Sequence, residues 1–139
     1  MSFPEDKTGN SDNSPPNHAV RFSPRADRET TEAATRLAMI TGSDDLALEW
    51  FFGIKAAAGT LATNPRQSPV NEDASRKIGE EDRRLLFQRT GSSNAAYHLF
   101  YTVEDAGDDG PRVAVIHVRH ASRKPITRAE AKDIRAGRE

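Results

Sequence analysis

The chain has 139 residues, no cysteine and a formal net charge of −1, and 35% of its residues are hydrophobic. This length fits a single domain, and the absence of cysteine excludes a disulfide framework and thiolate chemistry. No apolar run is long enough to cross a bilayer, and the N-terminal residues lack the apolar core of a secretory signal. We therefore expect a cytoplasmic protein with no membrane partner.

The charge is distributed unevenly along the chain. Residues 1–109 carry 12 basic and 18 acidic side chains, a net charge of −6. Residues 110–139 carry 8 basic and 3 acidic side chains, a net charge of +5. A basic segment attracts a phosphate backbone or an acidic partner, but the same residues can also simply solubilise a terminal helix.

The N-terminal segment, residues 1–17, is dominated by Asp, Asn, Ser, Pro and Gly and predicts a disordered tail. An alternating pattern at residues 18–22 then predicts a short strand. Ser23 and Pro24 indicate the start of a helix, because serine caps helices and proline suits their first position. Gly42 predicts its end. Five residues at helical spacing predict the buried stripe of this helix: Ala26, Thr30, Ala33, Leu37 and Ile40.

A second helix is predicted from Ser43, a helix cap, to the residues before Pro65. Trp50 lies on its apolar face and is interpreted as a core anchor. Two helices with a short connection form an antiparallel hairpin. The polar residues 66–82 predict a long loop with a helical turn near residues 74–78.

Three strands are predicted in the second half of the chain, at residues 83–89, 97–103 and 113–123. The loops between them span residues 90–95 and 104–112. We predict an α+β fold with an N-terminal strand, a helical hairpin and a three-stranded antiparallel meander. The strands form one sheet that the helices cover on one face, and the other face is expected to be open.

The last segment, residues 127–139, is basic and has a helical pattern. Thr127 and Glu130 have the spacing of a capping box. Because the segment has few apolar residues, we expect it to fold only against a partner. The predicted domain organisation is therefore a tail at residues 1–17, a domain at residues 18–126 and this C-terminal segment.

Side chains able to carry chemistry concentrate around the last strands. Histidine titrates near neutral pH and arginine binds phosphate through two nitrogens, so four residues are candidate catalytic groups: His98, His117, His120 and Arg123. Four more are candidates for binding phosphate or a target: Arg84, Arg89, Arg119 and Lys124.

Each of these candidates also has a structural interpretation. Strand alternation places His117 and Arg119 on one face and Ile116, Val118 and His120 on the other. A histidine that points into the core is a structural residue. An arginine can equally pair with an acid, and for Arg123 the candidates are Asp27 and Glu29.

No metal or cofactor is expected. The three histidines lack a carboxylate or cysteine at a recognised ligand spacing. The sequence also has no glycine-rich phosphate loop, no nucleophile elbow and no paired carboxylates.

The order and spacing of several segments resemble the RelE/ParE toxin superfamily, whose members are toxins of type II toxin–antitoxin modules, often labelled plasmid stabilisation proteins. Residues 84–87, 97–101 and 113–123, which end in a histidine-x-x-arginine pattern, are similar to its C-terminal half. Residues 20–27 and 61–66 are similar to its N-terminal half. The resemblance covers residues 18–126 and implies the topology predicted above.

The resemblance implies one of two targets, because RelE-like members cleave messenger RNA on the ribosome and ParE-like members inhibit DNA gyrase. RelE-like nucleases have lysines where residues 85–87 are apolar here, and an arginine where this chain has His98. Arg123 matches a RelE-like arginine, but no tyrosine lies beyond Tyr101. These departures favour a toxin that docks a gyrase-like target.

Two alternatives stay open at this point. One is an RNA-cleaving toxin that uses the histidine and arginine cluster, so the sequence leaves open whether the protein is an enzyme. The other is a non-toxic remnant that only binds its antitoxin. The resemblance implies a cognate antitoxin as partner in a hetero-oligomer, with gyrase or the ribosome and messenger RNA as target.

Overall fold

The computed structural model describes residues 18–88, 96–105 and 111–136. The predicted tail, Arg89 and the predicted loop at residues 90–95 lie outside the described residues. No helix in the described part of the chain is long and apolar enough to span a membrane. The elements are β1 (Ala19–Phe22), α1 (Pro24–Thr41), α2 (Asp44–Gly59), the 3-10 helix η2 (Thr60–Ala62), α3 (Glu72–Ile78), β2 (Arg83–Gln88), β3 (Ala96–Asp105), β4 (Pro111–His120) and α4 (Arg128–Ala136).

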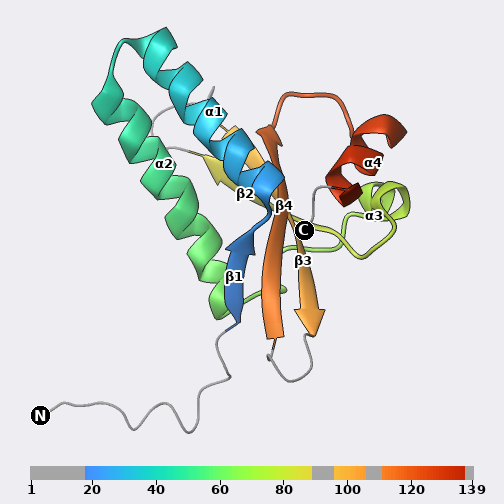
Figure 1. Cartoon of the computed structure of the whole chain (residues 1–139). Helices are drawn as coiled ribbons and strands as arrows, with labels where there is room; N and C mark the ends of the chain where they lie inside the picture. The colour runs from blue at the N-terminus through green and yellow to red at the C-terminus, as the bar shows by residue number, and fades with distance from the viewer. Residues whose placement is uncertain (1–17, 89–95, 106–110, 137–139) are drawn as a thin grey trace, which may run out of the picture.

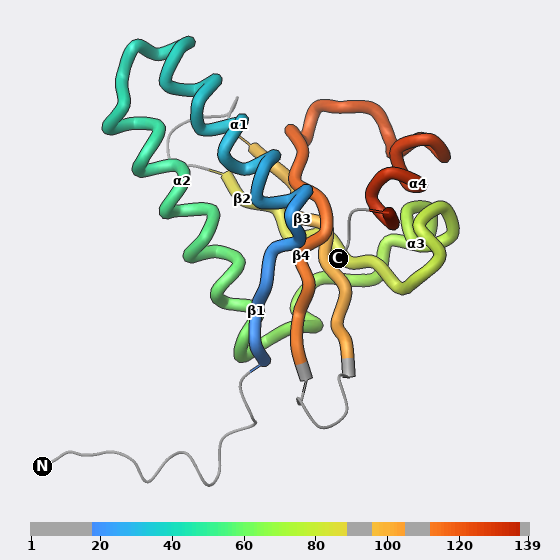
Figure 2. The backbone as a smooth tube through the Cα atoms, viewed as in Figure 1, coloured from blue at the N-terminus to red at the C-terminus, as the bar shows by residue number. Residues whose placement is uncertain are grey.

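The predicted α+β class is confirmed, and the four strands form one sheet (Figure 1). Strands β2, β3 and β4 form the predicted antiparallel meander. In space, however, the order is β1-β4-β3-β2, so the strands do not follow their order in the chain. Strand β1 lies beside β4 (Figure 2), and the two strands run parallel to each other, as their arrows in Figure 1 show. The long connection that parallel strands require is the chain between β1 and β4, which includes the helical hairpin, α3, β2 and β3.

The first helix has the predicted caps. The Ser23 Oγ accepts a hydrogen bond from the Ala26 amide at 3.1 Å, and Gly42 ends the helix with a φ of 69°. The inner part of the predicted stripe is buried, but Ile40 is 75% exposed, so its predicted burial is wrong. The reason is length, because the tip of the hairpin extends past the sheet (Figure 1).

The hairpin covers one face of the sheet, which we call the hairpin face. Trp50 is 1% exposed and contacts the rings of Phe87 and Tyr97 edge-on, with centroids 6.4 and 5.0 Å away. A Cβ at Gly53 would come within 2.9 Å of the Phe87 ring, so glycine allows this close approach of α2 to β2. The prediction that Trp50 anchors the core is therefore confirmed.

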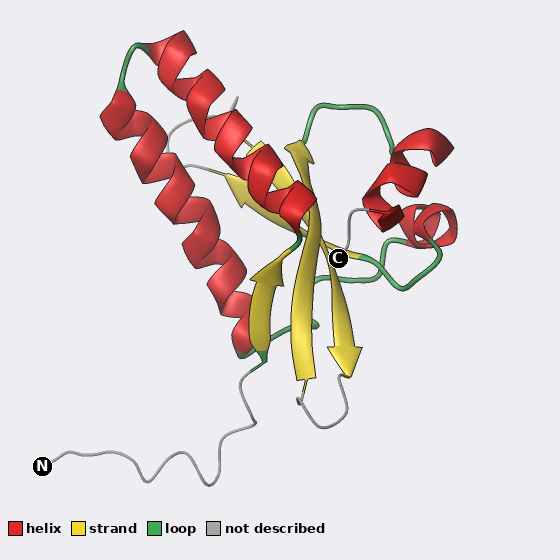
Figure 3. Cartoon of the chain, viewed as in Figure 1, coloured by secondary structure: helices red, strands yellow, loops and turns green. Residues whose placement is uncertain are grey.

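The opposite face of the sheet, which we call the second face, is partly covered, so the expectation of an open face is wrong. The predicted helical turn is a full helix, α3, and it packs with α4 beside this face (Figure 3). These helices form a second core with β3, β4 and the segment before α4: Ala74, Ile78, Phe100, Ile116, Ile126, Ala131 and Ile134.

The C-terminal helix is held by contacts within the chain, which corrects the expectation that it folds only against a partner. The Arg135 guanidinium donates hydrogen bonds to the carbonyls of Ile78 and Lys77, at 2.7 and 2.9 Å. Those carbonyls end α3 and would otherwise lack partners. The Lys77 ammonium in turn donates to the Ile126 carbonyl at 2.8 Å.

The attachment of α3 depends on Asn71, which gives a first prediction. The Asn71 Oδ1 accepts from the Ala74 amide at 2.8 Å, and the Asn71 amide donates to the Asp82 carbonyl at 2.7 Å. Substituting Asn71→Ala removes the cap and is expected to lower the free energy of unfolding by about 1 kcal/mol in urea titrations. Asn64→Ala, at an exposed position, is the control, and an equal loss in both variants would contradict this role.

Candidate anion-binding site

A β-bulge in β4 determines which side chains reach each face. Phe100 pairs with His117 and Tyr101 pairs with Val115, so Ile116 has no partner residue in β3. Ile116 therefore packs in the second core while Val118 packs on the hairpin face. The predicted placement of these two residues on one face is wrong, because strict alternation ends at the bulge.

His117 is held at this bulge by an acid from α1. Its Nδ1 lies 2.8 and 3.0 Å from the two carboxylate oxygens of Glu29, and the Val118 amide donates to the same carboxylate at 2.9 Å. Arg25 also pairs with Glu29, at 3.0 Å. Since His117 is 1% exposed, these contacts describe a structural histidine that joins α1 to β4.

The second face contains a pocket of about 270 Å³, which we call the arginine pocket. It lies between the sheet, the start of α3 and the segment that joins β4 to α4. Six of the eight predicted site residues line it: Arg84, His98, Arg119, His120, Arg123 and Lys124. Its other lining residues are Asp73, Ala74, Phe100, Ala121, Pro125 and Ile126. Of the remaining two predicted residues, His117 is not among those lining the pocket, and Arg89 lies outside the described residues.

His98 has an arginine nearby on each neighbouring strand, although its direct partner on β2 is Leu86 and Arg84 lies opposite Phe100. His98 is directly opposite Arg119 in the register of β3 and β4. The Arg84 guanidinium on β2 lies 5.0 Å from the centre of the Phe100 ring. Burial lowers the pKa of His98, and the charges of Arg84 and Arg119 lower it further. The imidazole is therefore neutral near pH 7 and can accept a proton.

Arg119 is a buried cation, and some of its guanidinium donors have no hydrogen-bond partner among the described residues. It is 5% exposed, and its Nη2 donates to the Lys124 carbonyl at 2.7 Å. Among the described residues, its Nε and Nη1 have no hydrogen-bond partner. Burial lowers the pKa of the guanidinium, but arginine remains charged at neutral pH. Buried donors usually have a partner, so these two can take an acceptor such as a water molecule or an anion.

Arg123 pairs with Glu130. Its Nη2 lies 3.2 Å from Glu130 Oε2, so the suggested pairing with Asp27 or Glu29 is wrong. Burial alone would raise the pKa of Glu130, but the Thr127 amide, Arg119, Arg123 and His117 together lower it. Glu130 is therefore an anion next to the pocket at neutral pH.

His120 lines the pocket but uses its ring elsewhere. The ring contacts Tyr97 edge-on, with centroids 5.2 Å apart. Its Nδ1 accepts from the Ser122 amide at 3.0 Å and lies 2.7 Å from the Ser122 hydroxyl. These contacts match the structural interpretation of His120, which leaves His98 as the pocket histidine placed between arginines.

Asp82 is a further unusual group that the sequence did not single out. It is completely buried, and among the described residues its carboxyl oxygens have no hydrogen-bond partner. Burial raises its pKa to about 8, although the nearby charge of Arg84 acts in the opposite direction. The only signal in the sequence was its position directly before a strand, which is too common to indicate burial.

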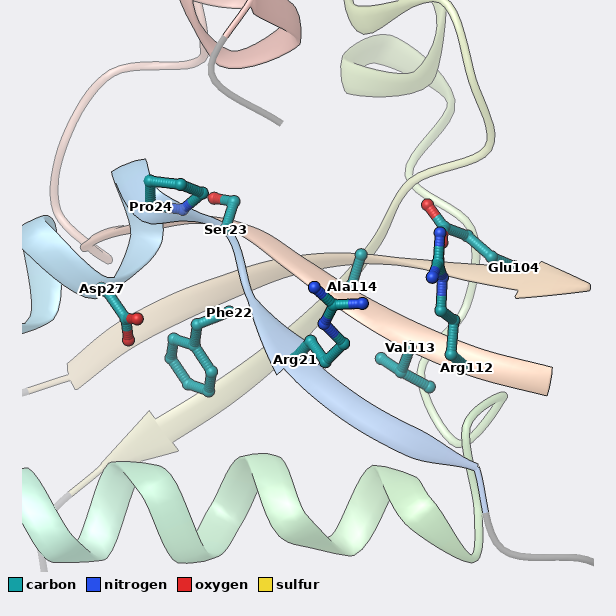
Figure 4. A pocket seen from close by; sticks show the side chains of 9 residues that line it. All are labelled: Arg21, Phe22, Ser23, Pro24, Asp27, Glu104, Arg112, Val113 and Ala114. Atoms are coloured by element: carbon teal, nitrogen blue, oxygen red, sulfur yellow. The ribbon is translucent and has the colours of Figure 1, made fainter. Parts of the chain in front are cut away.

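A larger depression of about 600 Å³ lies beside β1 (Figure 4). Arg21 projects from β1 and Arg112 from β4. Most charges around this depression are already paired, since Arg112 contacts Glu104 at 2.5 Å and Asp27 contacts Lys55 at 2.9 Å. It is lined by no histidine, so the arginine pocket is the stronger candidate for chemistry.

Neither pocket contains an evident metal centre, because no cluster of three or more His, Asp or Glu residues suited to a metal occurs in the described ranges. Comparisons of the whole chain add no identity: no family model matches it, and no curated protein matches it. The function therefore has to be inferred from the arginine pocket and from the segments that resemble RelE/ParE toxins.

Proposed function

We propose that this protein is the toxin of a type II toxin–antitoxin module and that it cleaves RNA in the arginine pocket. The observation that carries the proposal is the position of His98, a neutral base, between Arg84 and Arg119. The ordered resemblance to RelE/ParE toxins supports the wider assignment to toxins. The cognate antitoxin is the proposed partner, in a hetero-oligomer.

The proposed reaction is an in-line transfer within RNA. His98 removes the proton from a ribose 2′-hydroxyl, and the 2′ oxygen attacks the adjacent phosphorus while the bond to the 5′ oxygen breaks. The leaving oxygen takes up a proton from water, so the products are a 2′,3′-cyclic phosphate and a 5′-hydroxyl end. Arg119 and Arg84 stabilise the charge that develops on the phosphate oxygens.

This assignment also accounts for the departures from the RelE-like pattern. The lysines expected on β2 are missing, but Arg84 and Arg119 supply cations from the strands on either side of His98. The matched Arg123 supplies a third cation at the rim of the same pocket. The chemical requirements of a base and several cations are thus met by different residues.

A docking inhibitor is the second candidate, and it rests on a different surface. The hairpin exposes four large apolar side chains: Met39, Ile40, Leu48 and Phe52. Exposed apolar groups gathered on one hairpin suit a protein target, and gyrase is the target by resemblance. The two candidates therefore predict different surfaces for toxicity.

The test uses the purified full-length chain and a short RNA with a single unmodified ribose among 2′-O-methyl nucleotides. Cleavage at that ribose, with a cyclic phosphate product, is expected. An RNA without any free 2′-hydroxyl is the matched control and should remain intact. Failure to cleave RNA, on free oligonucleotides and on translating ribosomes alike, would contradict the proposal.

A cellular measurement separates the two candidates. After tight induction in a bacterial host, labelled precursors report DNA synthesis and protein synthesis separately. RNA cleavage predicts that protein synthesis fails first and that Arg119→Ala restores it. Gyrase-like docking predicts that DNA synthesis fails first and that Phe52→Glu restores it. If neither synthesis falters, the non-toxic remnant becomes the better account.

A further inference from the structure

We propose that Glu130 is a built-in competitor of the arginine pocket, which a phosphate group must displace from Arg119 and Arg123 in order to bind. The inference rests on the proposed function only in taking the pocket to be an anion site. It adds a regulatory role for α4 that the RNA-cleavage proposal does not require.

The geometry of Glu130 is that of a carboxylate shared by two arginines. Its Oε1 lies 3.5 Å from Arg119 Nη1, and its Oε2 lies 3.2 Å from Arg123 Nη2. The longer contact is at the limit of a hydrogen bond, so Glu130 neutralises Arg119 but leaves its buried Nε donor without a partner among the described residues. A phosphate has more oxygens and more charge than a carboxylate, so it can engage both arginines more completely.

Glu130 is held beside the pocket by the start of α4. The Thr127 amide donates to Glu130 Oε1 at 3.1 Å, and the Glu130 amide donates to Thr127 Oγ1 at 3.1 Å. This reciprocal capping box confirms the predicted spacing. The helix itself is anchored on α3 through Arg135, so the backbone of Glu130 stays beside the arginines and only its side chain has to move when phosphate binds.

The arrangement defines the ligand that the pocket prefers. A carboxylate ligand gains little binding free energy, because it only replaces the Glu130 carboxylate that already contacts the arginines. A phosphate monoester or diester gains contacts that Glu130 leaves unmade, so the site selects phosphate over carboxylate. The first turn of α4 thereby sets both the affinity and the selectivity of the pocket.

The test compares Glu130→Gln with Asp133→Asn by calorimetric titration of inorganic phosphate and of a non-cleavable 2′-O-methyl RNA. Glutamine keeps the capping box, because it serves at this position as well as glutamate. Asp133 lies one turn further along α4 and is exposed, so its variant removes the same charge away from the arginines. We expect phosphate to bind about fivefold more tightly to Glu130→Gln and with unchanged affinity to Asp133→Asn.

Two outcomes would overturn the inference: equal affinities in all three proteins, or no binding of phosphate by Glu130→Gln. A second readout uses the wild-type protein alone, so it does not depend on the folding of a variant. Displacement of the carboxylate predicts that phosphate shifts the NMR amide signals of Thr127 and Glu130, and absence of a shift at saturation would contradict it.

The inference and the proposed function fail in different ways. Tighter phosphate binding by Glu130→Gln without any RNA cleavage supports the competitor and contradicts the nuclease. RNA cleavage with unchanged phosphate affinity supports the nuclease and contradicts the competitor. Acetate titration is the selectivity control and should show no comparable gain.

Discussion

Substituting His98→Asn is expected to lower the rate of RNA cleavage at least about 100-fold, because the pocket then lacks its base. Asparagine retains a polar side chain of similar reach, so the fold should be unchanged by circular dichroism. His120→Asn is the matched control, since His120 lines the same pocket but has its ring on Tyr97 and Ser122. That variant should keep most of the activity.

The pH dependence of cleavage provides an independent check on the role of His98. Its pKa is lowered from the usual 6.5, so the neutral base is present at neutral pH. The wild-type rate should therefore be flat around pH 7 and fall only in acid, as the imidazole becomes protonated. The residual rate of His98→Asn should no longer fall in this acidic range. An unchanged profile in the variant would assign the base to another group.

The second large effect concerns stability rather than catalysis. Substituting Asp82→Asn is expected to stabilise the protein at pH 8 and to have little effect near pH 4. In the unfolded chain the Asp82 carboxyl ionises near pH 3.8, whereas in the folded protein it stays protonated up to about pH 8. Across that window the unfolded state releases a proton that the native state keeps, so the wild-type free energy of unfolding falls as pH rises.

The size of this effect has an upper limit. The difference between the two pKa values corresponds to at most about 5 kcal/mol at pH 8. The amide of the variant lacks a partner as the protonated carboxyl does, so the cost of an unsatisfied group is common to both proteins and cancels. We therefore expect a gain that approaches but does not exceed about 5 kcal/mol at pH 8.

Urea titrations between pH 4.5 and pH 9 measure this prediction directly. Glu81→Gln is the control, because Glu81 is the neighbouring acid and is exposed. The gain from Asp82→Asn should grow with pH and level off near pH 8, while Glu81→Gln shows no such trend. A stability difference that is constant with pH would mean that Asp82 is ionised in the native protein.

The local structure of this protein could be predicted from neighbouring residues. Ser23, Gly42 and the Thr127–Glu130 capping box act within one helical turn, so their caps appear where the sequence predicted them. The antiparallel meander also follows from strands joined by short loops. The apolar face of α2 likewise predicted Trp50 as a core residue, because helical spacing alone selects that face.

The candidate site could be predicted in composition but not in arrangement. The sequence named three histidines, four arginines and a lysine near the last strands, and six of these eight residues line one pocket. It did not distinguish the three histidines, because that depends on the bulge at Ile116 and on Glu29, which lies 88 residues from His117 in the chain. Neither the bulge nor the contact between Glu29 and His117 produces a periodic pattern in the sequence.

By itself, then, the sequence determined the helical hairpin, the capped start of the last helix, the three meandering strands, the core role of Trp50 and the basic C-terminal end, since propensity, capping and periodicity act over a few residues. Tertiary structure alone decided the parallel pairing of β1 with β4, the packing of α3 and α4 on the second face, and the burial of Asp82. It also brought His98 between two arginines and Glu130 beside them. These features depend on contacts between segments far apart in the chain, where the competing arrangements differ in packing and desolvation rather than in local preference.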